Sequence, residues 1–141
     1  MIRIVVYGEP APQGSKRHVG NGRMIESSKK VKPWREDVRA ECVLAVITDT
    51  GEPLRFDGPI RVRLTFTLRK PSSAPKTRIT WPCKKPDIDK LARSTLDAMT
   101  SSGIIADDAR VVELFAAKRF PNEGRDALDC PGVVIEIEAI A

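Results

Sequence analysis

The sequence predicts an α/β (α+β) fold: one mixed sheet of about four strands, with two helices packed on one of its faces. Residues 59–70 alternate between apolar and polar side chains, which is the period of a strand. Two other segments place their apolar residues on helical stripes. With the elements in the order β-α-β-α-β-β, every stripe is buried if both helices cover the same face. The 141 residues suit a single domain, 1–141.

The first part of the chain is predicted to form a strand, a long loop and a helix. Residues 2–8 are short and rich in β-branched side chains, which favours a strand. Residues 9–30 contain Pro, Gly, Ser and Asn without a regular period, so we expect a long loop, in which Asn21-Gly22 favours a hairpin turn. The next apolar stripe predicts a helix of about four turns. It consists of Val31, Trp34, Val38, Cys42 and Ala45.

The second part begins with the alternating strand at 59–70. A basic loop rich in Pro and Ser follows it, and a second helix runs over 87–102 and stops at Gly103. Residues 111–120 and 132–140 are predicted to be two further strands. The sheet face away from the helices should then carry arginines opposite glutamates, namely Arg61, Arg63, Glu136 and Glu138.

Composition limits the chemistry that is available. The chain has one histidine, His18, and three widely spaced cysteines, so a zinc site, a disulfide framework or chemistry that needs several histidines is not expected. A formal net charge of +5 and a pI near 9.3 favour a polyanionic partner. No apolar run reaches the length of a membrane span and no signal-peptide pattern follows Met1, so we expect a cytoplasmic location and no membrane partner.

Acidic residues gather in and after the second helix despite the basic composition. One interpretation is purely structural. Asp87 would be the N-cap of the helix, Asp89 a favourable acid in its first turn, and Asp97 an exposed acid paired with Arg93. Asp107 and Asp108 would then be turn residues.

The other interpretation is a metal site. Asp108 lies just before the strand at 111–120, and the cluster needs a cation if this end of the strand lies beside the start of the helix. Oxygen ligands without His or Cys favour Mg²⁺, with Mn²⁺ as a substitute. The spacing is not that of an EF-hand, because Lys90 follows the acid pair and no distal Glu is present.

The stretch "KKPDIDKLARSTLDAMTSSGIIADDARV" resembles the signature of the RusA family of Holliday junction resolvases, found in bacteria and often carried by phages. The matching features are a Pro-Asp-x-Asp pair, a "LDAL"-like helix, a glycine and an Asp-Asp pair before a strand. "GEPAPQGSKR", near the N-terminus, resembles the opening of that family more loosely. The resemblance implies a homodimeric, Mg²⁺-dependent endonuclease that cuts four-way DNA junctions symmetrically, without a small-molecule cofactor.

The resemblance also implies site residues. Asp87, Asp89 and Asp108 match the catalytic acids of the family, and Asp107 is their neighbour. Two positions depart from the pattern: Lys90 stands where the family commonly has Asn, and Arg93 where it has a lysine important for catalysis. An arginine keeps the positive charge but does not donate a proton near neutral pH, so this role is open between Arg93 and Lys90.

Two loops contain the residues that we predict to contact DNA phosphates. These are Lys16, Arg17 and Arg23 in the first loop, and Arg69, Lys70, Lys76, Arg78, Lys84 and Lys85 in the second. Taken singly, each of them is equally well explained as a solvated surface residue. Trp81 is predicted either to stack on an unpaired base or to pack on its own domain, whereas Trp34 is expected in the core or in a dimer interface.

Three functions therefore remain open from the sequence. The first is a junction-resolving nuclease. The second is a DNA-binding protein of the same fold that binds junctions without cutting them, because of Lys90 and Arg93. The third is a metal-dependent nuclease for another branched or flapped DNA.

Overall fold

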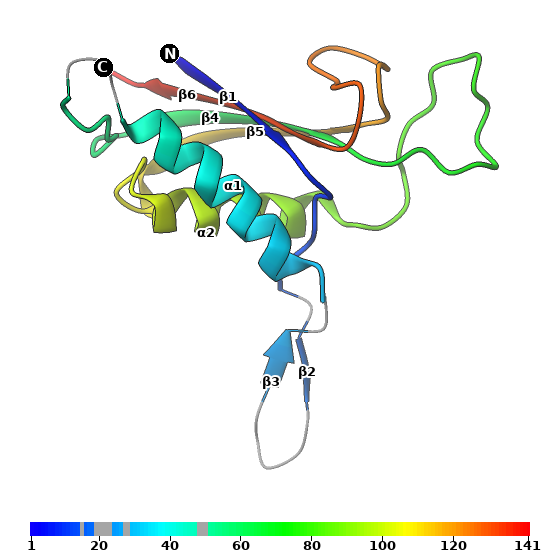
Figure 1. Cartoon of the computed structure of the whole chain (residues 1–141), viewed down its shortest axis with the longest axis horizontal. Coiled ribbons are helices and arrows are strands. Elements are labelled where there is room, and N and C mark those ends of the chain that lie inside the picture. The colour runs from blue at the N-terminus through cyan, green and yellow to red at the C-terminus, as the bar shows by residue number, and fades with distance from the viewer. Residues whose placement is uncertain (15, 19–23, 27–28, 48–50) are drawn as a thin grey trace.

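The computed structural model describes residues 1–14, 16–18, 24–26, 29–47 and 51–141, and of 16–18 and 24–26 it describes the backbone alone. A mixed sheet of four strands forms one layer, and both long helices lie against one of its faces (Figure 1). The helices are α1 (Val31–Val46) and α2 (Ile88–Ser102), and a 3₁₀ turn, η1 (Asp108–Arg110), precedes the third main strand in the sequence. The predicted architecture is thus confirmed.

The strands of the main sheet lie in the order β1-β6-β4-β5. Strands β4 and β5 are parallel, whereas β6 pairs antiparallel with both β1 and β4. This arrangement makes β5 an edge strand. The bounds are β1 (Ile2–Tyr7), β4 (Ile60–Thr67), β5 (Val111–Arg119) and β6 (Gly132–Ala139).

The predicted long loop after β1 contains two short strands, which sequence analysis did not identify as strands. They are β2 (Lys16–His18) and β3 (Met24–Glu26), and they pair antiparallel with each other. This pairing agrees with the predicted hairpin, although the turn expected at Asn21-Gly22 lies outside the described residues.

The core lies between the sheet and the helices, because one face of each strand is apolar. In β4 the residues at alternate positions, Ile60, Val62, Leu64 and Phe66, are fully buried. From the helix layer Trp34 packs into the same core, and its indole Nε1 donates a hydrogen bond of 3.3 Å to Thr95 Oγ1 of α2. This bond joins α1 to α2 and satisfies a polar atom that would otherwise be buried without a partner.

The opposite face of the sheet is polar, as predicted. Arg61 pairs with Glu138 at 3.1 Å and also with Glu113 of the edge strand, while Arg63 lies 3.7 Å from Glu136. The Arg63 guanidinium also lies over the ring of Phe115, 4.2 Å from its centroid. Exposed pairs of this kind contribute little stability individually, so they chiefly keep this face soluble and hold the strand register.

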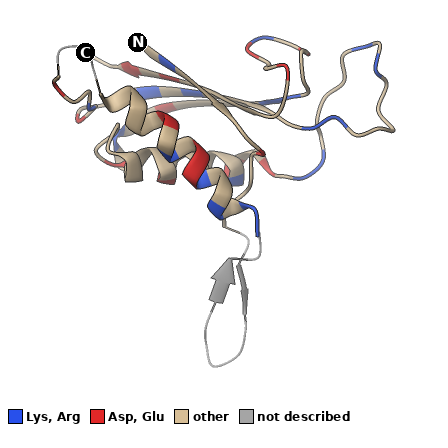
Figure 2. Ribbon diagram, viewed as in Figure 1, with Lys and Arg blue, Asp and Glu red and all other residues tan. Residues whose placement is uncertain are grey.

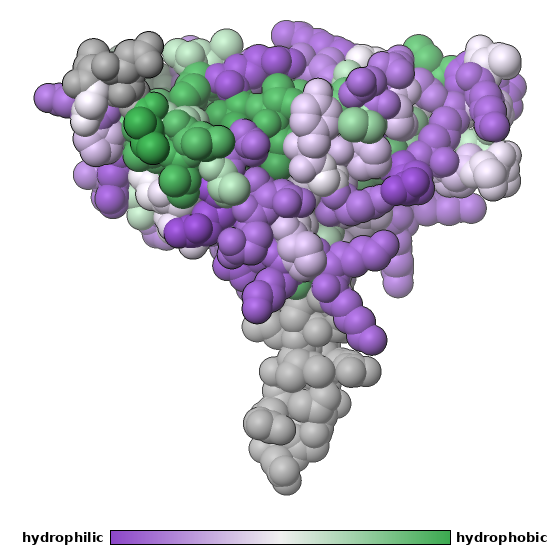
Figure 3. All heavy atoms as spheres, in the orientation of Figure 1, coloured by the Kyte–Doolittle hydropathy of each residue, from purple (hydrophilic) through white to green (hydrophobic). Residues whose placement is uncertain are grey.

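Apolar side chains remain exposed in a few places. Figure 3 shows an apolar area at the end of the molecule where α1 ends, and Leu44 and Ile47 are exposed at this end of the helix. None of the described helices is long and apolar enough to cross a membrane.

The burial of the cysteines gives a direct test of this packing. Cys42 is fully buried against the core and burial raises the pKa of its thiol to about 12, whereas Cys83 and Cys130 are exposed. We expect a thiol reagent at neutral pH to label Cys83 and Cys130 in the folded protein, and Cys42 only after denaturation. Mass spectrometry of the labelled peptides checks this, and rapid labelling of Cys42 in the native protein would contradict the position of α1.

Candidate active site and the basic loop beside it

The candidate site begins where the basic loop after β4 meets helix α2. Lys118, near the end of β5, fixes this junction: its ammonium donates hydrogen bonds of 2.9 Å to the carbonyl of Lys84 and 3.0 Å to that of Pro86. The half-buried Lys118 side chain therefore holds the residues directly before Asp87 against the sheet. Because both acceptors are backbone carbonyls, the contact depends on the position of the loop and not on its side chains.

A second contact holds the middle of the basic loop. Glu123, in the connection between β5 and β6, accepts hydrogen bonds from the Lys70 ammonium and from the backbone N–H of Thr80, the latter at 2.8 Å. Both bonds lower the pKa of the Glu123 carboxyl, and the bond from Lys70 has the larger effect. The side chains of Lys70 and Glu123 are only 15% and 12% exposed, so Lys70 serves to hold the loop and offers little surface to a phosphate.

Asp87 and Asp89 stand at the start of α2, as predicted. Asp87 is the N-cap residue of α2, as predicted, and has an extended backbone conformation, but its side chain makes no capping hydrogen bond. Its Oδ2 lies instead 3.6 Å from Lys90 Nζ. Both aspartates are exposed at the N-terminus of α2, the positive end of the helix dipole.

A second group of acids lies farther along α2. The pKa of Asp108 is raised by partial loss of hydration, by the charge of Asp107 and a hydrogen bond with it, and by the charge of Asp97. Asp97 is half-buried, and its carboxylate accepts a hydrogen bond from the Gln13 side-chain amide. The interpretation of Asp97 as an exposed partner of Arg93 is therefore wrong: its partner is Gln13, and it faces Asp108.

The segment that carries Asp107 and Asp108 is fixed by the connection between α1 and β4. Backbone hydrogen bonds join Phe56 to Ile104 at 2.8 Å and Ala106 to Phe56 at 2.9 Å. Ile104 and Ile105 are fully buried. Arg110 adds a contact of 3.2 Å to Asp57. These contacts hold the Asp-Asp pair against the middle of α2 and not against its start.

The two acidic groups are separated along the helix. Asp89 and Asp97 are eight residues apart in α2, which corresponds to a rise of about 12 Å. Within the described residues, no three acidic, histidine or cysteine side chains are close enough together to hold a metal ion. The donors themselves suit Mg²⁺, which needs only one or two carboxylates when waters and a substrate phosphate complete its shell.

The two predicted cations lie between these groups. Arg93 is exposed, and no ion pair of its guanidinium is found in the described part of the chain. It lies beside Gly14: a Cβ on that residue would be 3.1 Å from an Arg93 Nη. Gly14 has φ +111, which favours glycine, so the loop can approach α2 closely here.

The N-terminal loop docks on the same stretch of α2. The Gln13 N–H donates to the carbonyl of Lys90 at 3.0 Å, and Ser94 Oγ donates to the carbonyl of Ala11 at 2.6 Å. Together with the bond from Gln13 to Asp97, these contacts align the loop with the helix face that carries the acids. The loop that resembles the family opening is therefore part of the site.

The predicted DNA contacts divide into groups. Figure 2 shows basic residues along the loop that leads to α2, where Lys76, Arg78, Lys84 and Lys85 are exposed. Arg69 is exposed but bonds to Glu9 through its Nε at 3.1 Å. In the first loop, Lys16 and Arg17 lie in β2 with side chains that the structure does not describe, and Arg23 lies outside the described residues.

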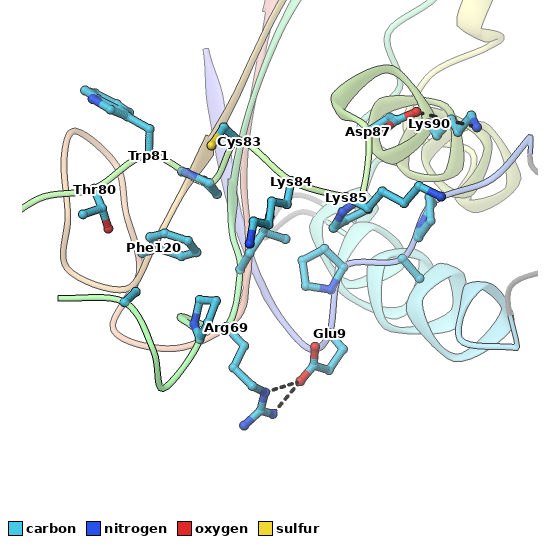
Figure 4. Close-up of a pocket in the computed structure, with 18 of the residues that line it drawn as sticks. Glu9, Arg69, Thr80, Trp81, Cys83, Lys84, Lys85, Asp87, Lys90 and Phe120 are labelled. Atoms are coloured by element: carbon cyan, nitrogen blue, oxygen red, sulfur yellow. Dashed lines mark hydrogen bonds and ion pairs between the residues drawn. The ribbon is translucent and has the colours of Figure 1, made fainter. Parts of the chain in front are cut away.

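A cavity of about 640 Å³ lies beside Asp87, between the basic loop and the segment after β1. Figure 4 shows Asp87 and Lys90 at one end, Phe120 and Thr80 at the other, and the side chains of Lys84 and Lys85 between them. The candidate site therefore combines exposed acids, basic side chains and an open cavity.

Comparison with known families agrees with this geometry. The family model described as "Endodeoxyribonuclease RusA" matches residues 7–138. The chain belongs to the RusA family. The members of this family are endodeoxyribonucleases that resolve Holliday junctions. No curated protein sequence matches the chain significantly.

Within this RusA-family site, sequence analysis missed the residues that bond to the loops but lie far from them in the sequence. Lys118 and Glu123 were not selected, because a lone cation in a strand and a lone acid in a turn carry no motif. Gln13 and Asp97 lie 84 residues apart, so their contact has no signal in local spacing. For Asp97, the only indication in the sequence of a role in the site was its place in the "LDAL"-like motif.

The hydrogen bond from Thr80 to Glu123 can be tested by NMR. In the Glu123→Gln variant we expect the Thr80 amide hydrogen to exchange several-fold faster, because the acceptor loses its charge and its bond to Lys70. In the wild type, the chemical shift of that amide should follow the titration of Glu123, with a midpoint below pH 4.5. The reason is that the hydrogen bonds favour the charged carboxylate and so lower its pKa in the folded protein.

The Leu68 amide, which donates to the Arg119 carbonyl, is the internal control and should exchange equally in both proteins. If the Thr80 amide behaves alike in both proteins, Glu123 does not hold the basic loop.

Proposed function

We propose that this chain is a Mg²⁺-dependent, structure-specific endodeoxyribonuclease that resolves four-way DNA junctions by symmetric phosphodiester hydrolysis in recombination and repair. The observation that carries the proposal is the position of Asp87 and Asp89: both are exposed where an acid-free basic loop meets a helix N-terminus. DNA bound along the loop would bring a phosphate to these carboxylates. Membership of the RusA family supports the same reaction.

Asp87 and Asp89 at the helix start would hold the metal, with waters and the substrate phosphate completing its shell. Asp108 and its neighbour Asp107 lie beside Asp97, too far along α2 to bind the same ion in this structure, and would join it when DNA binding draws the two groups together. When bound, Mg²⁺ lowers the pKa of a water and offsets charge on the phosphate. The like-charge contacts that raise the pKa of Asp108 support a cation requirement, because a divalent ion would relieve them. Mn²⁺ is the expected substitute.

The basic side chains would bind the DNA, stabilise charge and transfer protons. Lys84, Lys85, Lys76 and Arg78 would bind the DNA backbone, which fixes the strand relative to the acids. Arg93 projects from α2 between the two acidic groups and would stabilise negative charge on the scissile phosphate. Since a guanidinium keeps its proton, we assign any proton transfer in this region to Lys90.

Symmetric cleavage needs two sites, so we propose that the active form is a homodimer. The edge strand β5 supports this: Val112, Leu114 and Phe115 are 60%, 48% and 42% exposed. An open strand edge with apolar side chains is a surface that proteins normally cover.

One observation favours a second candidate function. Lys90 Nζ lies 3.6 Å from Asp87 Oδ2 and already compensates the charge of that carboxylate. If this pair persists on DNA, the protein would bind junctions without cutting them.

The experiment that separates these functions is a cleavage assay on a labelled synthetic four-way junction, with Mg²⁺, with Mn²⁺ and with EDTA. We expect paired nicks in the junction with either metal and none with EDTA, while linear duplex stays intact. A panel of flaps and three-way junctions tests for another branched substrate. Tight binding without cleavage in either metal would favour the junction-binding protein.

Asp89→Asn and Asp108→Asn should lower cleavage by at least about 100-fold, because each removes a charged ligand or a positioning carboxylate. Junction affinity, measured in EDTA, should stay equal or increase, since a negative charge near the phosphates is lost. Glu41→Gln, on the exposed surface of α1, is the matched control. Wild-type cleavage by either aspartate variant would remove that residue from the site.

Arg93→Ala is expected to lower turnover by about 100-fold with a much smaller loss of affinity, because its charge would act mainly in the transition state. Arg93→Lys should restore part of the rate. Single-turnover kinetics on the junction with saturating enzyme give the two quantities separately. A loss of affinity at unchanged turnover would make Arg93 a simple phosphate contact.

A further inference from the structure

The cavity beside Asp87 has features of a ligand site that the cleavage chemistry does not require. Its volume of about 640 Å³ lies within the range of small-molecule and nucleotide pockets. The basic loop forms one wall through Pro71, Ala74, Pro75 and Pro82, and Phe120, directly after β5, contributes the edge of a ring that is 7% exposed. Proline and aromatic surfaces of this kind accept flat apolar groups at low conformational cost.

Charge distinguishes this cavity from a purely apolar pocket. Its lining includes five Lys or Arg residues and two acids. Both acids already have cationic partners, since Glu9 pairs with Arg69 and Asp87 with Lys90. Lys84 and Lys85 remain exposed, and their side chains lie between the Phe120 end and the Asp87 end (Figure 4). The cavity therefore fits a ligand that is both flat and anionic.

We infer that this cavity binds one unpaired nucleotide of the DNA strand that is to be cut, and this inference rests on the proposed function. The base would lie against Phe120 and the loop prolines. The phosphate would contact Lys84 and Lys85, and the strand would continue from there to Asp87. The cavity is open to solvent on one side and has room for a single nucleotide, so we expect it to take an unpaired base in preference to a base pair. Single strands offer unpaired bases, and the branch point of a four-way junction offers base pairs that lack continuous stacking and open at lower cost, whereas linear duplex offers neither.

The anchors of the loop determine the shape of this site. Lys118 holds the backbone of Lys84 and Pro86, and Glu123 holds Thr80, so two walls of the cavity are fixed before DNA binds. A preformed site loses little entropy on binding and can select one position in the strand. The subsite would thus place cleavage at a fixed distance from an unpaired base.

Trp81 provides a probe for occupancy. It lies at the rim of the cavity, is 66% exposed, and has the Arg119 guanidinium 5.6 Å from its ring centroid. The other tryptophan, Trp34, is 1% exposed in the core. A change in tryptophan emission on adding a non-fluorescent oligonucleotide therefore reports on Trp81.

The test measures binding of a short oligothymidylate, and of a blunt duplex of the same length, to the full chain in EDTA. Ala74→Phe fills the cavity and Phe120→Leu removes the aromatic ring while keeping an apolar side chain. Ile79→Ala is the matched control, because Ile79 is 60% exposed on the same loop but does not line the cavity. Protection of Cys42 from thiol reagents verifies that each variant is folded.

We expect oligothymidylate to quench Trp81 and to bind Ala74→Phe and Phe120→Leu at least about fivefold more weakly than wild type. Duplex affinity should be unchanged in both, and Ile79→Ala should match wild type with both probes. Wild-type affinity of the cavity variants for oligothymidylate would overturn the inference. A parallel loss of duplex affinity would also overturn it, since this would mean a general effect on the basic loop.

The result is separable from the proposed function. Binding in EDTA involves no cleavage, so a selective loss in the cavity variants would support the subsite even if the wild type cuts no junction. Conversely, the wild type could cut junctions with Mg²⁺ while the cavity variants bind oligothymidylate as tightly as wild type. This result would support the proposed nuclease and overturn the subsite alone.

Discussion

The site depends first on the contact between Lys118 and the end of the basic loop. The residues from 71 to 86 contain four prolines and no regular structure, so few backbone hydrogen bonds are available to fix their path. The Lys118 ammonium provides two bonds at the last point before α2. Because β5 is a rigid strand of the sheet, these bonds transfer the geometry of the core to Asp87, to the start of the helix and to the wall of the cavity.

A second constraint is electrostatic and acts along α2. Carboxylates stand at the N-terminus of α2, where the dipole favours them, and beside its middle, where Asp108 loses hydration and is repelled by Asp107 and Asp97. The fold retains this unfavourable group although a neutral side chain at any of these positions would relieve it. Structural explanations account for the first group and for Asp97, which binds Gln13, but they do not explain why Asp107 and Asp108 lie beside it. The repulsion around Asp108 is the feature that the proposed metal ion would relieve.

The sequence was sufficient to predict the sheet and the helices because their signals are local. Strict alternation in β4 and the stripes of α1 and α2 determine which faces are buried, and the polar outer face followed from Arg61 and Arg63. Long-range contacts had no such signal. Gln13 reaches Asp97 across most of the chain, and Lys118 acts through backbone carbonyls that no side-chain pattern reveals. Likewise, nothing in the spacing showed that the Asp-Asp pair would meet the middle of α2, since its position depends on the backbone contacts of Phe56.

The substitution at position 93 is best understood through the loop that packs beside it. A guanidinium is wide and planar, and it lies here against Gly14, where a side chain would come within 3.1 Å of it. The glycine and the arginine therefore fit each other, and the N-terminal loop can still bond to Lys90 and Ser94. This fit argues that Arg93 is accommodated by its surroundings and is not a damaged lysine position. An arginine with this position between the two acidic groups suits the proposed stabilisation of a phosphate in the transition state, for which position matters more than proton donation.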